Sequence, residues 1–330
     1  MNKNITKKFI HIGFGKCGSS KLQKDIFPTI SEFKNLNYWG DEYKNKSLER
    51  EMMQTSLLNH VTRTELGKET RPIKIEKDYL ISNEELSSYR DADLINFFAE
   101  NNLKAFGQDS HIMLVIREPR DWLSSVYIQL CIHEKPLQKP NTFFLDDSEY
   151  SSRLPDQKFN IDKFSYQKII EKYKGLFQTF TFIKFESLGN MEALSEIFLL
   201  DKDQKSHLKD LYKNKYVNKS ISKFAYKILW KISSILTLFN LSFANKYNNH
   251  IYLERSNYKF VDNPKIKNKS LIRQTIRNIF NYKVFQKYID KVIKYEKYMI
   301  NFDLLKKINI EKLEKEYKEL PDYKTFDKND

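Results

Sequence analysis

Residues 10–23, IHIGFGKCGSSKLQ, place three glycines between an apolar segment and a segment with helical spacing. Gly13, Gly15 and Gly18 fall within this short stretch, although the chain has only 8 glycines among 330 residues, against a usual fraction of about 7%. Glycine lets backbone N–H groups turn toward an anion because it has no Cβ. The stretch therefore predicts a strand, a phosphate-binding loop, and a helix whose N-terminus adds positive charge.

The side chains of this loop fit the same interpretation. Lys16 supplies a full positive charge, and Ser19 and Ser20 supply hydroxyl donors. The spacing is not that of a Walker A motif, in which Ser or Thr directly follows the lysine, because Cys17 and Gly18 follow Lys16. A tight strand-to-helix turn with an incidental lysine is the alternative interpretation.

A second informative stretch is LVIREPRDWLSSVY, residues 114–127. Its apolar strand ends at Arg117, where a nucleotide hydrolase would carry a metal-binding aspartate. The arginine fork suits phosphate, and Ser125 follows about two helical turns later. Two such elements at the carboxyl ends of parallel strands indicate a ligand with two separate phosphate groups. The alternative is a helix-capping turn with a surface arginine.

Strands alternate with helices over the first two thirds of the chain, which predicts an α/β fold. We expect a core of residues 1–215 and a helical extension of residues 216–330, packed together as one domain. Strands are expected at 8–14, 78–82, 111–116 and 179–185, and helices at 20–27 (ending before Pro28), 43–64, 84–100, 121–132 and 161–173. A long loop is expected at 135–160, and an almost wholly helical pattern beyond residue 190.

The net charge of +14 favours anionic partners, although a lysine-rich composition of this kind also produces a plain solvated surface. The two cysteines, Cys17 and Cys131, exclude a disulfide scaffold and a four-cysteine zinc site. We find no signal-peptide pattern and no long uncharged apolar stretch. These observations predict a protein in a reducing compartment, the cytoplasm.

Residues 221–245 predict one pronounced amphipathic helix. Lys223, Lys227, Lys231 and Ser234 form a polar stripe, and apolar residues fill the other side. Three interpretations stay open. The segment could be a helix on the inner face of a membrane with its lysines at the headgroups, a wall of the cleft that holds the acceptor of a transferred group, or a buried packing helix.

The two motifs together resemble those of the PAPS-dependent sulfotransferases, most closely the bacterial, carbohydrate-directed members. IHIGFGKCGSSKLQ resembles the family's 5′-phosphosulfate loop, and LVIREPRDWLSSVY is similar to its 3′-phosphate motif. Weaker similarities follow in the family's order at residues 80–87, 182–188, 216–220 and 299–310.

The resemblance implies a P-loop-like, three-layer α/β/α fold with a central parallel sheet. It implies metal-independent transfer of a sulfuryl group from PAPS to a hydroxyl of a cell-surface polysaccharide or a glycolipid precursor, with no nucleic-acid partner. Lys16 would stabilise the leaving phosphosulfate, and Arg117 and Ser125 would hold the 3′-phosphate. The 5′-phosphosulfate would be bound by the loop residues Gly15, Lys16, Cys17, Gly18, Ser19 and Ser20.

Transfer to a hydroxyl needs a base within hydrogen-bond reach, and the family uses Glu or His. Glu84, just after an expected strand, is the first candidate, and Glu42 is the second. His11 and His111 lie within expected strands and favour structural roles. Glu84 could instead cap its helix.

Two other classes of function remain as alternatives. A small-molecule kinase that uses ATP would need a magnesium ligand, which the two motifs do not offer. A non-enzymatic basic protein that binds polyanions or membranes would show steep salt dependence, but it would leave the paired anion motifs without a purpose.

Overall fold

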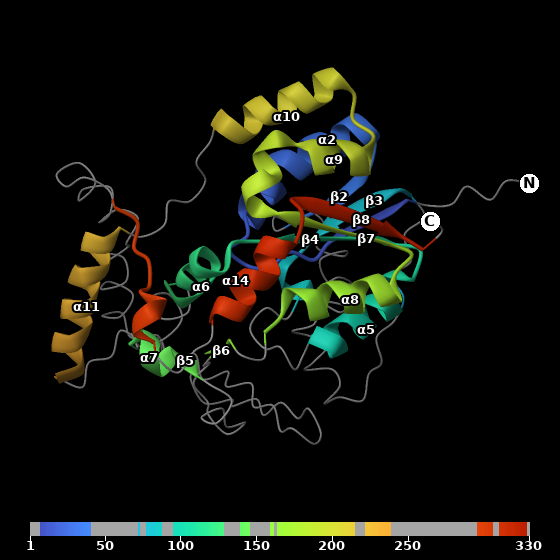
Figure 1. Ribbon diagram of the computed structural model, residues 1–330. Coiled ribbons are helices and arrows are strands. Elements are labelled where there is room, and N and C mark those ends of the chain that lie inside the picture. Colours follow the sequence, from blue (N-terminus) through green and yellow to red (C-terminus); the bar gives the residue numbers. More distant parts are fainter. Residues whose placement is uncertain are drawn as a thin grey trace, which may run out of the picture. The chain divides into compact units, whose positions relative to one another are not determined.

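The computed structural model describes residues 7–40, 72, 77–87, 95–128, 139–145, 159–161, 164–214, 222–238, 296–305 and 310–328 (Figure 1). The chain forms two compact units. Unit 1 comprises Met1–Pro119, Asp162–Val217 and Glu311–Asp330, and unit 2 comprises Arg120–Ile161 and Asn218–Ile310. The units interleave along the sequence, and the expected division at residue 215 into a core and an extension stays a prediction.

Unit 1 is built on a six-stranded sheet with the order β2-β3-β1-β4-β7-β8. The strands are β1 (Lys8–His11), β2 (Asn37–Trp39), β3 (Tyr79–Ser82), β4 (His111–Ile116), β7 (Thr179–Lys184) and β8 (Tyr323–Asp327). All neighbouring pairs are parallel except β7 with β8. The predicted α/β class is confirmed, and the sheet is mixed rather than wholly parallel.

Helices lie on both faces of this sheet. Figure 1 shows α2 and α9 on one face and α5 and α8 on the other. The helices of unit 1 are α1 (Ser19–Lys21), α2 (Phe27–Lys34), α5 (Ile95–Phe106), α8 (Tyr166–Leu176), α9 (Glu192–Phe198), α10 (Lys202–Asn214) and α14 (Ile310–Glu319). Helices on both faces explain why β4, HIMLVI, is a continuous apolar run, since such a strand is buried on both sides.

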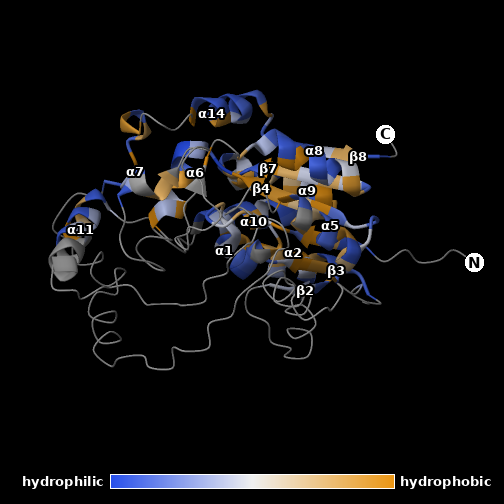
Figure 2. Ribbon diagram, turned by 90° about the horizontal axis from the view of Figure 1, so that it is seen from below, coloured by the Kyte–Doolittle hydropathy of each residue, from blue (hydrophilic) through white to orange (hydrophobic). Residues whose placement is uncertain are grey.

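The core of unit 1 is apolar and well covered. Ile10, Leu80, Ile112, Leu114 and Phe182 are each no more than 1% exposed, and Figure 2 shows hydrophobic residues concentrated around β4 and β7. Burial of this kind is the main favourable term in folding. The core thereby fixes the register of the strands whose ends carry the polar residues described below.

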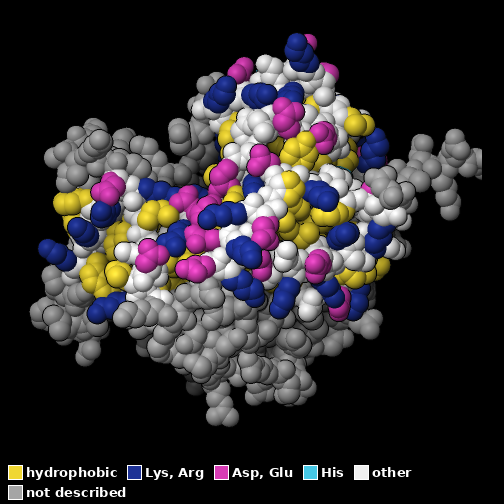
Figure 3. Space-filling model, viewed as in Figure 1, with side chains coloured by type: hydrophobic (Ala, Val, Ile, Leu, Met, Phe, Trp, Pro, Cys, Tyr) yellow, Lys and Arg dark blue, Asp and Glu magenta, His cyan; other side chains and the backbone are white. Residues whose placement is uncertain are grey.

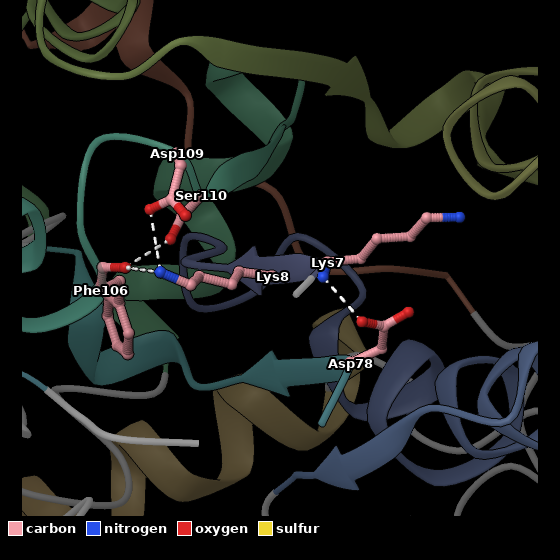
Figure 4. Close-up of polar contacts among 6 residues, drawn as sticks. All are labelled: Lys7, Lys8, Asp78, Phe106, Asp109 and Ser110. Carbon is pink, nitrogen blue, oxygen red and sulfur yellow. Dashed lines mark hydrogen bonds and ion pairs between the residues drawn. The ribbon is translucent and has the colours of Figure 1, made fainter. Parts of the chain in front are cut away.

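Polar contacts hold the amino-terminal edge of the sheet (Figure 4). The backbone N–H of Lys7 donates to Asp78 Oδ1 at 2.8 Å, which ties the start of β1 to the start of β3. Lys8 Nζ lies 2.9 Å from Asp109 Oδ1 and 3.4 Å from the Phe106 carbonyl oxygen. The Ser110 hydroxyl donates to the same carbonyl at 2.8 Å. The polar groups in these contacts bind one another at the amino-terminal edge. In open α/β sheets, ligands bind at the opposite edge, outside the carboxyl ends of the strands.

The expected helix end before Pro28 is wrong. The helical segment from Ser19 passes through a π-helical turn, Leu22–Ile26, and continues as α2 to Lys34. Pro28 lies in the first turn of α2, where the missing N–H of proline costs little. The wider π turn therefore lets the chain continue as a helix through the proline.

Three other expectations need correction. Beyond residue 190 the described segments include a strand, β8, that the expected helical pattern did not contain. The expected loop at 135–160 contains α7 (Pro140–Phe143) and a short parallel pair, β5 (Phe144–Leu145) with β6 (Phe159–Asn160). The expected strand at 8–14 ends at His11, since the following residues form the glycine loop. The expected helix at 43–64 lies outside the described residues.

Unit 2 has its own aromatic core. It contains α6 (Pro119–Ile128), α7, β5, β6 and α11 (Lys223–Leu238). Tyr127 packs against Phe143 and Phe144 with ring centroids 5.3 and 6.2 Å away, and its hydroxyl lies 2.9 Å from that of Tyr226. Among the described residues of the chain, no helix is long and apolar enough to cross a membrane.

Candidate functional site

The glycine loop follows β1 and turns tightly before the helix begins at Ser19. Lys16 and Gly18 both have left-handed backbone conformations, with φ of 72° and 84°. The Phe14 carbonyl oxygen accepts from the Cys17 N–H at 3.2 Å and from the Ser19 hydroxyl at 3.3 Å. These bonds close the loop upon itself and place it at the N-terminus of a helix, where N–H groups lack intrahelical acceptors.

The loop separates an exposed charge from buried packing residues. Lys16 is exposed, whereas Gly15, Cys17 and Ser19 are buried. A lysine with positive φ is uncommon and costs of the order of 1 kcal/mol or more. The backbone strain lies at the residue whose charge the resemblance assigns to the leaving group.

Arg117 directly follows β4, the strand beside β1, and reaches the glycine loop. Its Nη1 donates to the Lys16 carbonyl oxygen at 3.0 Å. The guanidinium lies over the ring of Phe185, 4.8 Å from the ring centroid, and the Tyr166 hydroxyl donates to the Arg117 carbonyl oxygen at 2.7 Å. The arginine is thus held at three places while its charge lies beside the loop.

Glu186 supports the same turn from the carboxyl end of β7. Its Oε1 accepts from the Glu118 N–H at 3.2 Å, and its Oε2 accepts from the Tyr317 hydroxyl of α14. In the sequence, residues 182–188 carry only a weak similarity to the family. The positions of Phe185, Tyr166 and Tyr317 at this site could not be predicted, because their partners lie far away in the sequence.

Glu84 lies at the carboxyl end of β3, in a short 3₁₀ turn, Glu84–Leu86. The Asn83 N–H donates to the His11 carbonyl oxygen at 3.0 Å, and the Ser87 hydroxyl donates to the Gly13 carbonyl oxygen at 2.9 Å. Both bonds attach the Glu84 turn to the segment that leads into the glycine loop. The fold therefore brings the loop, Glu84 and Arg117 to one edge of the sheet.

The pKa of the Cys17 thiol is affected by the charged residues that meet at this edge of the sheet. Burial raises the pKa of the Cys17 thiol well above its ordinary value; the Arg117 charge opposes this rise, and the charges of Glu84 and Glu186 add to it. The thiol is therefore neutral near pH 7 and unsuited to act as a nucleophile. Its contribution to the loop is packing.

Three more residues, Ser125, Glu42 and Ser20, were expected at the site. Ser125 belongs to unit 2, where its hydroxyl donates to the Asp121 carbonyl oxygen of α6 at 2.8 Å. Glu42 lies outside the described residues. Ser20 is part of α1 and is partly exposed. Within the ranges that the structure describes, no group of three or more His, Cys, Asp or Glu side chains is placed to hold a metal ion.

Lys21 fixes the helix that follows the loop. Its Nζ lies 2.8 Å from Asp25 Oδ2 and 2.8 Å from the Leu211 carbonyl oxygen in α10. Both partners are protein groups, and the Lys21 side chain is only 11% exposed. We therefore assign Lys21 a structural role, in contrast to the exposed Lys16.

His11 is the buried residue on which the loop begins. Its side chain is fully buried, its Nδ1 lies 2.7 Å from Ser82 Oγ, and its Nε2 has no hydrogen-bond partner among the described residues. A Cβ on Gly13 would approach the His11 ring to 2.5 Å, so the first glycine allows the ring and the backbone to pack closely. Burial lowers the pKa of His11 from its usual 6.5 to about 3.

This buried imidazole predicts a loss of stability in mild acid. Below about pH 6.5 the unfolded chain takes up a proton at this position that the folded chain does not bind, so stability falls as the pH drops from 7 toward 3. We expect the ring to lower the free energy of unfolding by about 2 kcal/mol between pH 7 and pH 5. Urea unfolding at each pH measures this slope.

The variant His11→Gln should flatten the slope, and His207→Gln, on the exposed side of α10, should leave it unchanged. A residual slope is expected from His111, whose pKa burial lowers to about 4. An identical pH dependence in wild type and His11→Gln would show that the His11 ring is not held neutral.

Comparison with known proteins adds no family assignment. No protein-family model matches the chain, and no curated protein matches it.

Proposed function

We propose that the protein transfers a sulfuryl group from PAPS to a hydroxyl of a carbohydrate acceptor. The observation that carries this proposal is the contact between Arg117 Nη1 and the Lys16 carbonyl oxygen, 3.0 Å apart. It joins the two elements that the sequence predicts to bind anions, and both follow the carboxyl ends of adjacent strands. A ligand with two separate phosphate groups matches this pair, and PAPS is such a ligand.

The residues present suit this cofactor. The loop from Gly15 to Ser20 offers an exposed lysine and backbone N–H groups at the start of a helix. Arg117 offers a fork for the 3′-phosphate, and the sequence resemblance adds Ser125. We also propose that the α/β fold is of the P-loop-like type found in this family. When bound, PAPS supplies a sulfuryl group on a phosphate leaving group.

Each residue then has a defined task. Lys16 would attract the negative charge that develops on the departing phosphate oxygen. Glu84 would take the proton that the acceptor hydroxyl loses as its oxygen bonds to sulfur. Phe185, Tyr166 and Glu186 would hold the Arg117 turn, so that its charge is in place before the ligand arrives.

The class of acceptor comes from the resemblance to carbohydrate-directed sulfotransferases. We propose a hydroxyl of a cell-surface polysaccharide or of a glycolipid precursor. A hydroxyl nucleophile is compatible with a carboxylate base at the sheet edge, since its proton must be removed during transfer.

Titration calorimetry with PAP, the product that remains when PAPS has lost its sulfuryl group, and with ATP in the presence and absence of Mg²⁺, tests the proposal. We expect PAP to bind without magnesium, and Lys16→Ala to weaken it by about ten- to a hundredfold, the usual worth of a charge-assisted hydrogen bond. Lys24→Ala is the matched control, because Lys24 is an exposed lysine on the helical segment that follows the loop. Failure of the wild-type protein to bind PAP would overturn the proposal, and magnesium-dependent ATP binding would favour a kinase.

A further inference from the structure

Unit 2 carries an exposed surface that the proposed reaction does not use. On α11, Lys223, Lys227 and Lys231 are exposed at intervals of four residues, and Phe224 is 41% exposed. Figure 3 shows basic and hydrophobic side chains next to one another over this helix. We call the set Lys223, Phe224, Lys227 and Lys231 the α11 face.

The orientation of α11 is fixed by its opposite side. Ala225 is fully buried, and the Tyr226 ring stacks on that of Tyr298 with the centroids 3.7 Å apart. Ser222 pairs with Lys297 in an antiparallel bridge just before the helix starts. Because these contacts bury one side of the helix, the residues of the α11 face point to solvent.

The charge of this face is positive. The sequence of α11, KFAYKILWKISSILTL, contains no acidic residue. Lys223 Nζ lies 2.8 Å from Glu296 Oε1, whereas Lys227 and Lys231 form no ion pair within the part of the chain that the structure describes. Like charges four residues apart repel one another on a helix, and an anionic partner relieves that repulsion.

Apolar exposure next to these charges narrows the choice of partner. Met299, in the segment that runs beside the start of α11, is 38% exposed. A purely polyanionic partner would need only the lysines and would leave Phe224 and Met299 in water. An anionic lipid surface fits both properties, because its headgroups attract lysines and its acyl boundary receives apolar side chains.

We propose that the α11 face binds the surface of an anionic lipid bilayer. The helix lies in the plane of the interface, with Phe224 directed into the acyl boundary and Lys227 and Lys231 at the headgroups. This contact is peripheral. Membrane contact would bring an enzyme with a lipid-linked acceptor to its substrate. The proposal of membrane binding rests on the geometry of unit 2 alone and does not depend on the proposed activity.

Vesicle flotation with the full-length protein tests this proposal. Vesicles of phosphatidylcholine alone are compared with vesicles that also contain phosphatidylglycerol, at low and high salt. We expect binding to the anionic vesicles, weakened by salt. Lys227→Gln with Lys231→Gln should reduce it by about fivefold for each lysine removed. Phe224→Ser should weaken it through the lost apolar contact.

The control pair is Lys315→Gln with Lys318→Gln, which removes the same charge from exposed positions on α14 in unit 1. Circular dichroism checks that all variants are folded. Wild-type protein that does not float with anionic vesicles would overturn the proposal, and so would an equal loss in the control pair. Binding of single-stranded nucleic acid, lost in the Lys227→Gln and Lys231→Gln variant while vesicles stay unbound, would assign the face to nucleic acid instead. PAP calorimetry on the same variants shows whether a loss of vesicle binding occurs while PAP binding is unchanged, which separates membrane binding from the proposed reaction.

Discussion

Glu84→Gln is expected to lower sulfuryl transfer by about 10²- to 10⁴-fold while PAP still binds, because a positioned base contributes that much to the rate. Glutamine keeps the size of the side chain and loses only its ability to take a proton. Glu84 lies at the carboxyl end of β3, beside the segment that leads into the glycine loop. Transfer of labelled sulfuryl from PAPS to a panel of oligosaccharides and glycolipids measures the rate.

The control for this experiment is Glu32→Gln, which removes an exposed carboxylate from α2. Equal PAP affinity in wild type and Glu84→Gln would show that the loop is intact and that the defect is chemical. Full activity of Glu84→Gln would exclude Glu84 as the base and leave Glu42→Gln as the next variant to test.

Gly18→Ala is expected to weaken PAP binding by at least tenfold and to destabilise the fold. Gly18 has φ of 84°, a conformation that costs an alanine roughly 1–2 kcal/mol. A Cβ at this position would also lie 2.7 Å from Cε2 of Phe185, the ring over which Arg117 lies. The substitution therefore disturbs the loop backbone and the arginine together. Calorimetry with PAP and urea unfolding measure the two effects.

Two other glycines provide matched controls. Gly107 also has φ of 84°, and a Cβ there would meet chiefly the flexible Asp109 side chain, so Gly107→Ala should lower stability without changing PAP binding. Gly175, in α8, has nothing within 4 Å of an added Cβ, and Gly175→Ala should raise stability by about 0.5–1 kcal/mol. If Gly18→Ala binds PAP as wild type does, the loop is not the phosphosulfate site.

The sheet was predictable from the sequence wherever a strand is buried on both sides. β4 coincides with the apolar run at residues 111–116, and β3 and β7 lie within one residue of the expected ranges. β8 was missed because its residues, YKTFD, include no buried side chain and carry no clear alternation. It forms because the edge of β7 offers unpaired backbone groups, which is a tertiary cause that local pattern does not reveal.

Part of the candidate site was also predictable from the sequence, and part was not. The glycine loop, Glu84 and Arg117 were expected at one edge, because each follows a strand whose apolar run marks where it ends. The contacts that hold the turn at Arg117 and Glu118 could not be predicted. Tyr166 begins α8, Glu186 follows β7, and Tyr317 belongs to α14, so only the folded chain brings them together.

The last described segment of the chain also has a bearing on the order in which the protein folds as it is synthesised. β8 closes the edge of β7, and Glu316 of α14 accepts from the Ser165 hydroxyl at 3.0 and 2.9 Å at the start of α8. Residues 185–322 must be synthesised before β8 can reach β7, and residues 166–315 must be synthesised before Glu316 can reach Ser165. Until then the nascent chain exposes an open, apolar strand edge of the kind that recruits other chains. Partly synthesised copies should therefore depend on chaperones more than the finished protein does.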